Sequence, residues 1–332
     1  MGYILRAIDE TETIKISAAI TTDVVEEAAK IHKLSKTTSA ALGRVLTATA
    51  IMGSWQKNEK DSITMSINGN GPAGSVVATC KNDGYVKGYV SNPGADLPIR
   101  ESDGKIDVSG AVGQGNLTIV MDTGMKKPYT GTVNLTSGEI AEDLAVYFLQ
   151  SDQVPSAVGL GVLVDVDYSI KAAGGFIVQL MPDCREEEIA KLEENLKKLK
   201  NVTSVIDEYH DAEKLIEILM EGMNYKVLEK REVEYKCNCS REKVEDAIVS
   251  VGPKEIEEIL KEDKKAEVNC YFCDKVYDFD EEDLERMLKK AKDINKNREV
   301  IIQDNFWLKK RKIAHEAIFF LFYTIKNFFH GF

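Results

Sequence analysis

Four of the six cysteines in the chain fall into two tight pairs. Cys237 and Cys239 have the spacing C-x-C, and Cys270 and Cys273 have the spacing C-x-x-C. Zn²⁺ takes four thiolates in tetrahedral structural sites, and a short turn presents two sulfurs to one ion at little cost in loop entropy. The spacing therefore predicts one Zn²⁺ ion per chain. Because C-x-C is tighter than the common zinc knuckle and the spacer is unusually long, the alternative is four unrelated thiols.

The other two cysteines, Cys80 and Cys184, stand alone and are interpreted as buried or incidental thiols.

The N-terminus enters a polar, acidic stretch without the basic and apolar segments of a signal peptide. We therefore expect a cytoplasmic protein, in which thiols stay reduced. Paired cysteines there bind metal or react with oxidants more often than they form structural disulfides.

Charge argues against a nucleic-acid partner. The chain has 332 residues and a net charge of −12, with 43% hydrophobic and 30% charged residues, as in a soluble protein of two or three domains. Residues 233–295 carry 12 basic and 18 acidic side chains, so the cysteine segment is itself near 12 − 18 = −6. A phosphate backbone needs the opposite sign.

The elements that must position these cysteines form an α+β arrangement. We expect residues 1–180 to be an N-terminal sheet-and-helix domain, with helices covering an antiparallel or mixed sheet. The expected helices are 37–55 and 139–150, and strand patterns fill 3–20, 62–133, 156–166 and 170–180. Residues 69–74 match G-x-G-x-x-G but continue into a strand, whereas a dinucleotide site needs a helix there. We interpret them as a turn.

Residues 181–232 predict a linker region of amphipathic helices docked on the first domain. Leucines and isoleucines recur at helical spacing on a background of Glu and Lys. Such helices are stable mainly while docked, so they could be released to bind other proteins. The candidate client-binding residues on these helices are Leu192, Leu196, Leu199, Leu215 and Leu219.

Residues 233–294 predict a small zinc domain. Ser240 caps a helix over 241–251, a second helix covers 254–262, and a hairpin over 266–268 and 275–279 flanks Cys270 and Cys273. A unit with so few large apolar side chains has little core, so we expect metal binding to supply much of its folding free energy.

These motifs together resemble the thirty-three-kilodalton heat-shock protein family of redox-regulated holdase chaperones. The resemblance covers residues 3–294, and the pairing of C-x-C with C-x-x-C at this separation is distinctive of the family. The other stretches that carry it are 6–7, 40–44, 69–72, 127–131, 137–144, 155–157, 173–176 and 237–242.

The resemblance implies a switch. Reduced protein would hold zinc through Cys237, Cys239, Cys270 and Cys273 and be inactive. Oxidation would form the disulfides Cys237–Cys239 and Cys270–Cys273, release zinc, unfold the linker and let the protein bind unfolding clients without ATP. We expect no enzymatic activity, and a homodimer in the oxidised form.

A C-x-C disulfide is strained, because an extended backbone places its Cα atoms about 6.6 to 7 Å apart, and strain makes the bond readily reduced.

Two alternatives and one departure remain. A zinc ribbon that binds nucleic acid or a protein partner is the main rival, and a thiol-disulfide oxidoreductase is the third possibility.

Residues 295–332 lie beyond the resemblance and hold 7 of the 11 Phe. This tail is an accidental extension, a docked helix or an interfacial membrane segment. Its apolar run, 317–325, is too short to span a bilayer, so we expect no membrane partner.

Overall fold

The computed structural model describes residues 1–199, 201–304 and 323–325. The chain divides into two compact units, the first covering Met1–Cys237 and the second beginning at Asn238. The predicted boundaries at residues 180 and 232 therefore both fall inside the first unit.

One mixed sheet of ten strands organises the first unit, in the order β7-β6-β3-β4-β5-β10-β1-β2-β9-β8. Neighbouring strands are antiparallel except β10 and β5, which pair in parallel at Glu234–Tyr85 and Tyr235–Val86. The strands are β1 (Gly2–Asp9), β2 (Ile14–Ile20), β3 (Ser62–Gly69), β4 (Ser75–Lys81), β5 (Tyr85–Val90), β6 (Gly115–Asp122), β7 (Tyr129–Asn134), β8 (Ser156–Val164), β9 (Ile170–Leu180) and β10 (Tyr225–Tyr235). The α+β expectation is confirmed.

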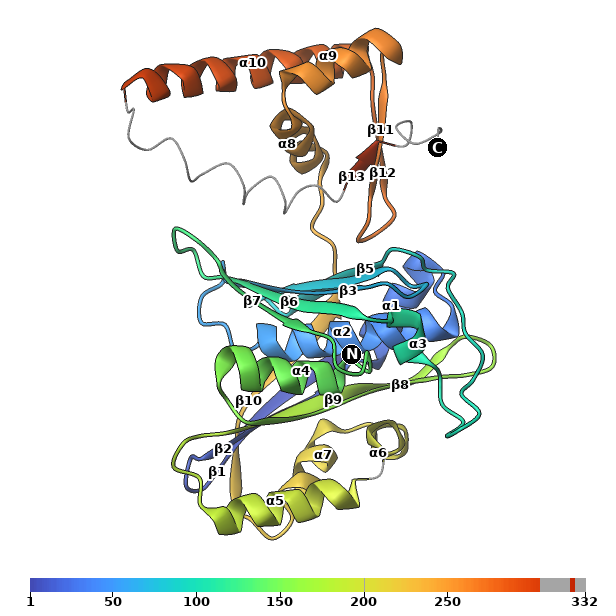
Figure 1. Ribbon diagram of the computed structural model, residues 1–332, viewed down its shortest axis with the longest axis vertical. Coiled ribbons are helices and arrows are strands. Elements are labelled where there is room, and N and C mark those ends of the chain that lie inside the picture. Colours follow the sequence, from blue (N-terminus) through green and yellow to red (C-terminus); the bar gives the residue numbers. More distant parts are fainter. Residues whose placement is uncertain (200, 305–322, 326–332) are drawn as a thin grey trace. The chain divides into compact units, whose positions relative to one another are not determined.

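Helix α2 (Lys36–Gly53) lies between the two halves of this sheet and is buried on nearly all sides (Figure 1). Its many Ala, Thr, Ser and Gly residues let a neighbouring strand and a neighbouring helix approach closely. A Cβ on Gly43 would come within 2.7 Å of Val162 and 2.8 Å of Val25. The smaller helices of this layer are α1 (Thr22–His32), α3 (Val108–Val112), α4 (Ala141–Tyr147) and the π-helix η1 (Phe148–Asp152). The helix expected over 139–150 is thus a short α-helix that continues into a π-helix.

Three short helices cover the opposite face of β1, β2 and β9 (Figure 1). They are α5 (Glu186–Lys198), α6 (Val202–Tyr209) and α7 (Ala212–Leu219). Both ends of α7 are tied down. The Tyr3 hydroxyl donates to Asp211 Oδ1 at 2.6 Å and accepts from the Ala212 amide at 2.9 Å, while Asn195 Nδ2 on α5 donates to the Leu219 carbonyl at 3.0 Å.

Strand β10 was not predicted. It directly follows the docked helices, runs antiparallel to β1 and brings the chain to Cys237. Its sequence is mostly Lys, Arg and Glu and shows no alternation of apolar and polar residues over most of its length. In the structure Val227 and Leu228 are exposed, and buried residues begin only at Val233. The glycine-rich segment 69–74 is a turn between β3 and β4, which confirms its interpretation.

The second unit contains α8 (Arg241–Val251), α9 (Pro253–Glu262), β11 (Ala266–Cys270), β12 (Val276–Phe279), α10 (Glu281–Asp304) and β13 (Tyr323–Ile325). The predicted cap is present, since Ser240 accepts from the Lys243 amide at 3.3 Å, and β11 and β12 form the predicted antiparallel hairpin. In the tail assigned to 295–332, α10 continues to Asp304 and β13 pairs with β11. Most of the tail's aromatic run lies outside the described residues.

Candidate metal centre

The second cysteine pair is built into the turn of the β11–β12 hairpin. Cys270 ends β11 and its amide donates to the Lys275 carbonyl at 3.0 Å. The amides of Cys273 and Asp274 both donate to the Cys270 carbonyl, at 3.2 and 2.8 Å, and Asp274 takes a left-handed conformation (φ 54°). This compact turn brings both sulfurs to the same side.

The first pair occupies the segment between β10 and α8. Strand β10 ends two residues before Cys237, and the Lys236 amide donates to the Val86 carbonyl at 3.0 Å. Cys239 immediately precedes Ser240, the cap of α8. Each cysteine of this pair is therefore adjacent to a residue that is held in place by a hydrogen bond.

All four sulfurs come together. Their Sγ atoms lie within 4.8 Å of one another, and Cys239 and Cys273 are 3.4 Å apart. A tetrahedral site with Zn–S bonds of about 2.3 Å has sulfur–sulfur edges of about 3.8 Å. Cys270 is buried and the other three are partly buried. The donor set and its spacing therefore fit one tetrahedral ion of the kind that favours thiolates.

Two residues for which the sequence predicted no role in the metal site lie close to it. The Tyr277 hydroxyl on β12 donates to Cys239 Sγ at 3.1 Å. Arg241 on α8 donates to the Asp278 carbonyl at 2.8 Å, forms an ion pair with Asp283 and lies 4.4 Å from the centre of the Phe279 ring. Tyr277 and Phe279 alternate with polar or exposed residues along β12, so the sequence could have predicted that both are buried. No sequence pattern predicts that the Tyr277 hydroxyl contacts a cysteine sulfur.

The environment of Tyr277 keeps its hydroxyl protonated. Burial raises the pKa of the Tyr277 phenol, and the hydrogen bond to Cys239 and the negative charge of the neighbouring cysteine sulfurs raise it further. The phenol therefore remains a hydrogen-bond donor throughout the neutral range.

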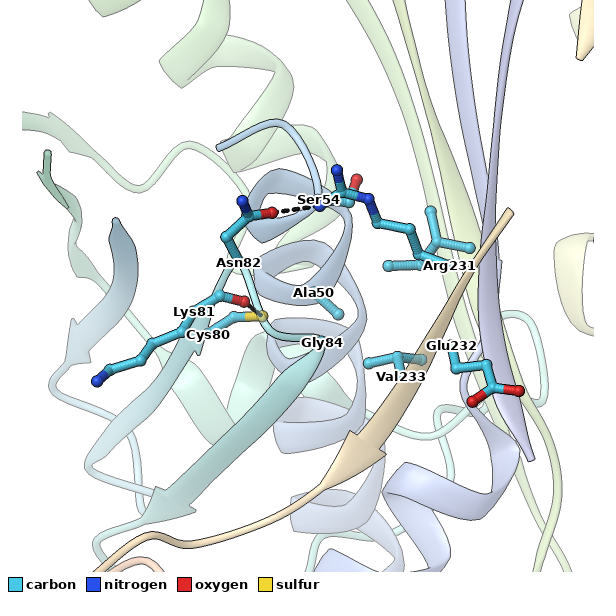
Figure 2. Close-up of a pocket in the computed structure, with 10 residues that line it drawn as sticks. Ala50, Ser54, Cys80, Lys81, Asn82, Gly84, Arg231, Glu232 and Val233 are labelled. Carbon is cyan, nitrogen blue, oxygen red and sulfur yellow. Dashed lines mark hydrogen bonds between the residues drawn. The ribbon is translucent and has the colours of Figure 1, made fainter. Parts of the chain in front are cut away.

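The two isolated cysteines lie elsewhere. Cys80 on β4 is buried beside Ala50, Gly84 and Val233 (Figure 2), and burial raises the pKa of its thiol to about 12. That value makes it a poor nucleophile and confirms the interpretation of a buried thiol. Cys184 is partly buried just before α5, with its sulfur 3.9 Å from a Glu188 carboxylate oxygen.

Four of the five candidate client-binding leucines lie on the docked helices, Leu199 directly follows α5, and all five contact one apolar cluster. Leu192, Leu215 and Leu219 are 3%, 0% and 0% exposed, and Leu196 and Leu199 pack against them while partly buried. The sheet side of the same cluster is formed by Leu5, Ile14, Ile16, Ala18, Phe176 and Val178. In this state Leu192, Leu215 and Leu219 are inaccessible to another protein, and Leu196 and Leu199 are only partly accessible.

The chain is similar to proteins of one family along most of its length. The model of the family described as Hsp33 protein matches residues 2–280. A 33 kDa chaperonin of Clostridium perfringens is 47% identical over 86% of this chain and 90% of its own, and one of Clostridioides difficile is 46% identical over 86% and 98%. The crystal structure of the 33 kDa chaperonin (heat shock protein 33 homologue) of Thermotoga maritima is 40% identical, covers 88% of this chain and 99% of its own, and superposes with a TM-score of 0.79.

Within the described part of the chain, none of the helices combines the length and the apolar character that a membrane crossing requires.

Proposed function

Because the chain belongs to the Hsp33 family, whose relatives are named chaperonins, it has a chaperone role, and we propose that this role is that of an ATP-independent holdase switched by oxidation. The observation that carries the proposal is that four cysteine sulfurs lie within 4.8 Å of one another. In the same structure, most of the candidate client surface is buried against the sheet. We further propose a cytoplasmic, non-enzymatic protein whose partners are unfolding proteins, and whose oxidised form is a homodimer.

In the reduced state, Cys237, Cys239, Cys270 and Cys273 would hold one Zn²⁺. When bound, the ion would supply folding free energy to the second unit and keep the sulfurs deprotonated. Hydrogen peroxide would then oxidise each pair. Two thiolates lose two electrons, one S–S bond forms, and the peroxide O–O bond breaks to give two hydroxides. The proposed products are Cys237–Cys239 and Cys270–Cys273, after which no thiolate ligand remains.

The linker helices connect this chemistry to client binding. Cys237 follows β10, and β10 follows α7, so disorder that begins at the cysteines and frees β10 from β1 and β5 would reach the docked helices along one continuous segment. Release of α5, α6 and α7 would expose Leu192, Leu196, Leu199, Leu215 and Leu219 together with the sheet face beneath them. Large exposed apolar patches bind unfolded chains with little specificity.

Titration of zinc and free thiols before and after peroxide separates this function from its rival. We expect one zinc per chain in reduced protein, and the loss of four thiols together with all zinc after oxidation. A zinc ribbon that binds nucleic acid or a protein partner is expected to keep its ion under the same dose, because a purely structural site needs ligand sulfurs that react slowly with oxidant. Retention of zinc after full peroxide treatment would contradict the switch. The acidic charge of residues 233–295 already disfavours the nucleic-acid alternative.

A further inference from the structure

The hydrogen bond from Tyr277 to Cys239 places a fixed donor on one member of the first cysteine pair. Tyr277 is 5% exposed and pairs with Val268 across the β11–β12 hairpin. That register directs its ring into the core of the second unit and leaves its hydroxyl 3.1 Å from Cys239 Sγ. The contact joins the hairpin of the second pair to a cysteine of the first.

A donor at this position changes the reactivity of the sulfur. Hydrogen bonds to ionised acceptors are about twice as strong as neutral ones, and outer contacts of this kind tune metal-binding ligands. The bond draws electron density from the sulfur, and a less basic sulfur is a weaker nucleophile. Because ligand sulfurs are deprotonated at neutral pH, the effect on nucleophilicity is not masked by protonation.

We propose that Tyr277 is a positioning residue that sets the oxidant threshold of the Cys237 and Cys239 pair. This inference rests on the proposed redox function and adds its regulation. The step that Tyr277 slows is attack of the Cys239 sulfur on hydrogen peroxide. An S–O bond forms, the O–O bond breaks and hydroxide leaves. The Cys237 sulfur then displaces a second hydroxide as the S–S bond forms.

The substitution Tyr277→Phe keeps the ring and removes the donor. We expect the second-order rate constant for peroxide oxidation of Cys239, measured by alkylation and mass spectrometry, to rise roughly fivefold, from the strength of a charge-assisted hydrogen bond and a Brønsted coefficient of about 0.4–0.5. In Co²⁺-substituted protein we also expect the sulfur-to-metal charge-transfer band to move to lower energy, since the sulfur becomes a better electron donor.

Phe279→Leu is the matched control, because Phe279 is buried on the same face of β12 as Tyr277 and its side chain has no hydrogen-bond donor. It should destabilise the unit without shifting the Co²⁺ band. An unchanged rate constant and band in Tyr277→Phe would overturn the proposal, as would an equal acceleration in Phe279→Leu, which would indicate general loosening.

If Tyr277→Phe fails to fold, 3-fluorotyrosine at position 277 provides the opposite test. It preserves the shape of the side chain and strengthens the donor, so oxidation should slow, and unchanged or faster oxidation would overturn the proposal. None of these readouts involves a client. The proposed chaperone function can therefore fail in aggregation assays while the Tyr277 result stands, and the reverse is also possible.

Discussion

Replacing any one of the four clustered cysteines by serine is expected to abolish stable zinc binding and unfold the second unit. The described core of that unit is small, with Tyr277 and Phe279 as its buried aromatic residues. Structural zinc sites contribute about 10 to 16 kcal/mol to folding in isolated finger peptides, more than a core of this size supplies. Hydrogen exchange over residues 238–294 and metal analysis would measure both effects.

Cys80→Ser and Cys184→Ser are the controls for this experiment. Both residues lie outside the sulfur cluster, so both variants should keep one zinc per chain and a protected second unit. Full zinc content in both Cys239→Ser and Cys270→Ser would contradict the assignment of the ligands.

Loosening the docked helices is expected to activate the protein without oxidant. Leu215 is fully buried between α7 and the sheet. Truncation to alanine should cost about 3 kcal/mol of docking free energy, which raises the population of released helices roughly a hundredfold. Reduced, zinc-loaded Leu215→Ala should therefore suppress client aggregation at a temperature where the unaltered protein is inert.

Leu228→Ala is the matched variant, because Leu228 on β10 is 53% exposed and is not a member of the buried cluster beneath these helices. It should behave as the unaltered protein does. Limited proteolysis of residues 183–221 would report release of the helices independently of activity. If Leu215→Ala releases them and still fails to hold a client, the surface assigned to client binding is wrong.

Local patterns predicted much of this structure. The two cysteine pairs, the Ser240 cap, the β11–β12 hairpin and the glycine turn at 69–74 each depend on residues close together in sequence. The helices that carry the five leucines also follow from periodicity, because a docked face needs one apolar stripe.

Contacts between distant segments were not predictable in the same way. Strand β10 pairs with β1 more than 200 residues earlier, for example Val233 with Gly2, and its charged pattern lacks a strand period. The bond from Tyr277 to Cys239 depends on how α8 and the hairpin pack, which no single-sequence pattern encodes. Burial of α2 on nearly all sides became clear only once both halves of the sheet were in place.

Light scattering from a thermally unfolding client tests the redox switch most directly. One preparation is assayed without nucleotide in three states: reduced and zinc-loaded, oxidised by peroxide with mild heat, and returned to the first state with reductant and zinc. We expect scattering to be suppressed only by the oxidised sample, and the returned sample to be inert again. Equal suppression by the reduced, zinc-loaded protein would contradict the redox switch, even if a chaperone activity remained.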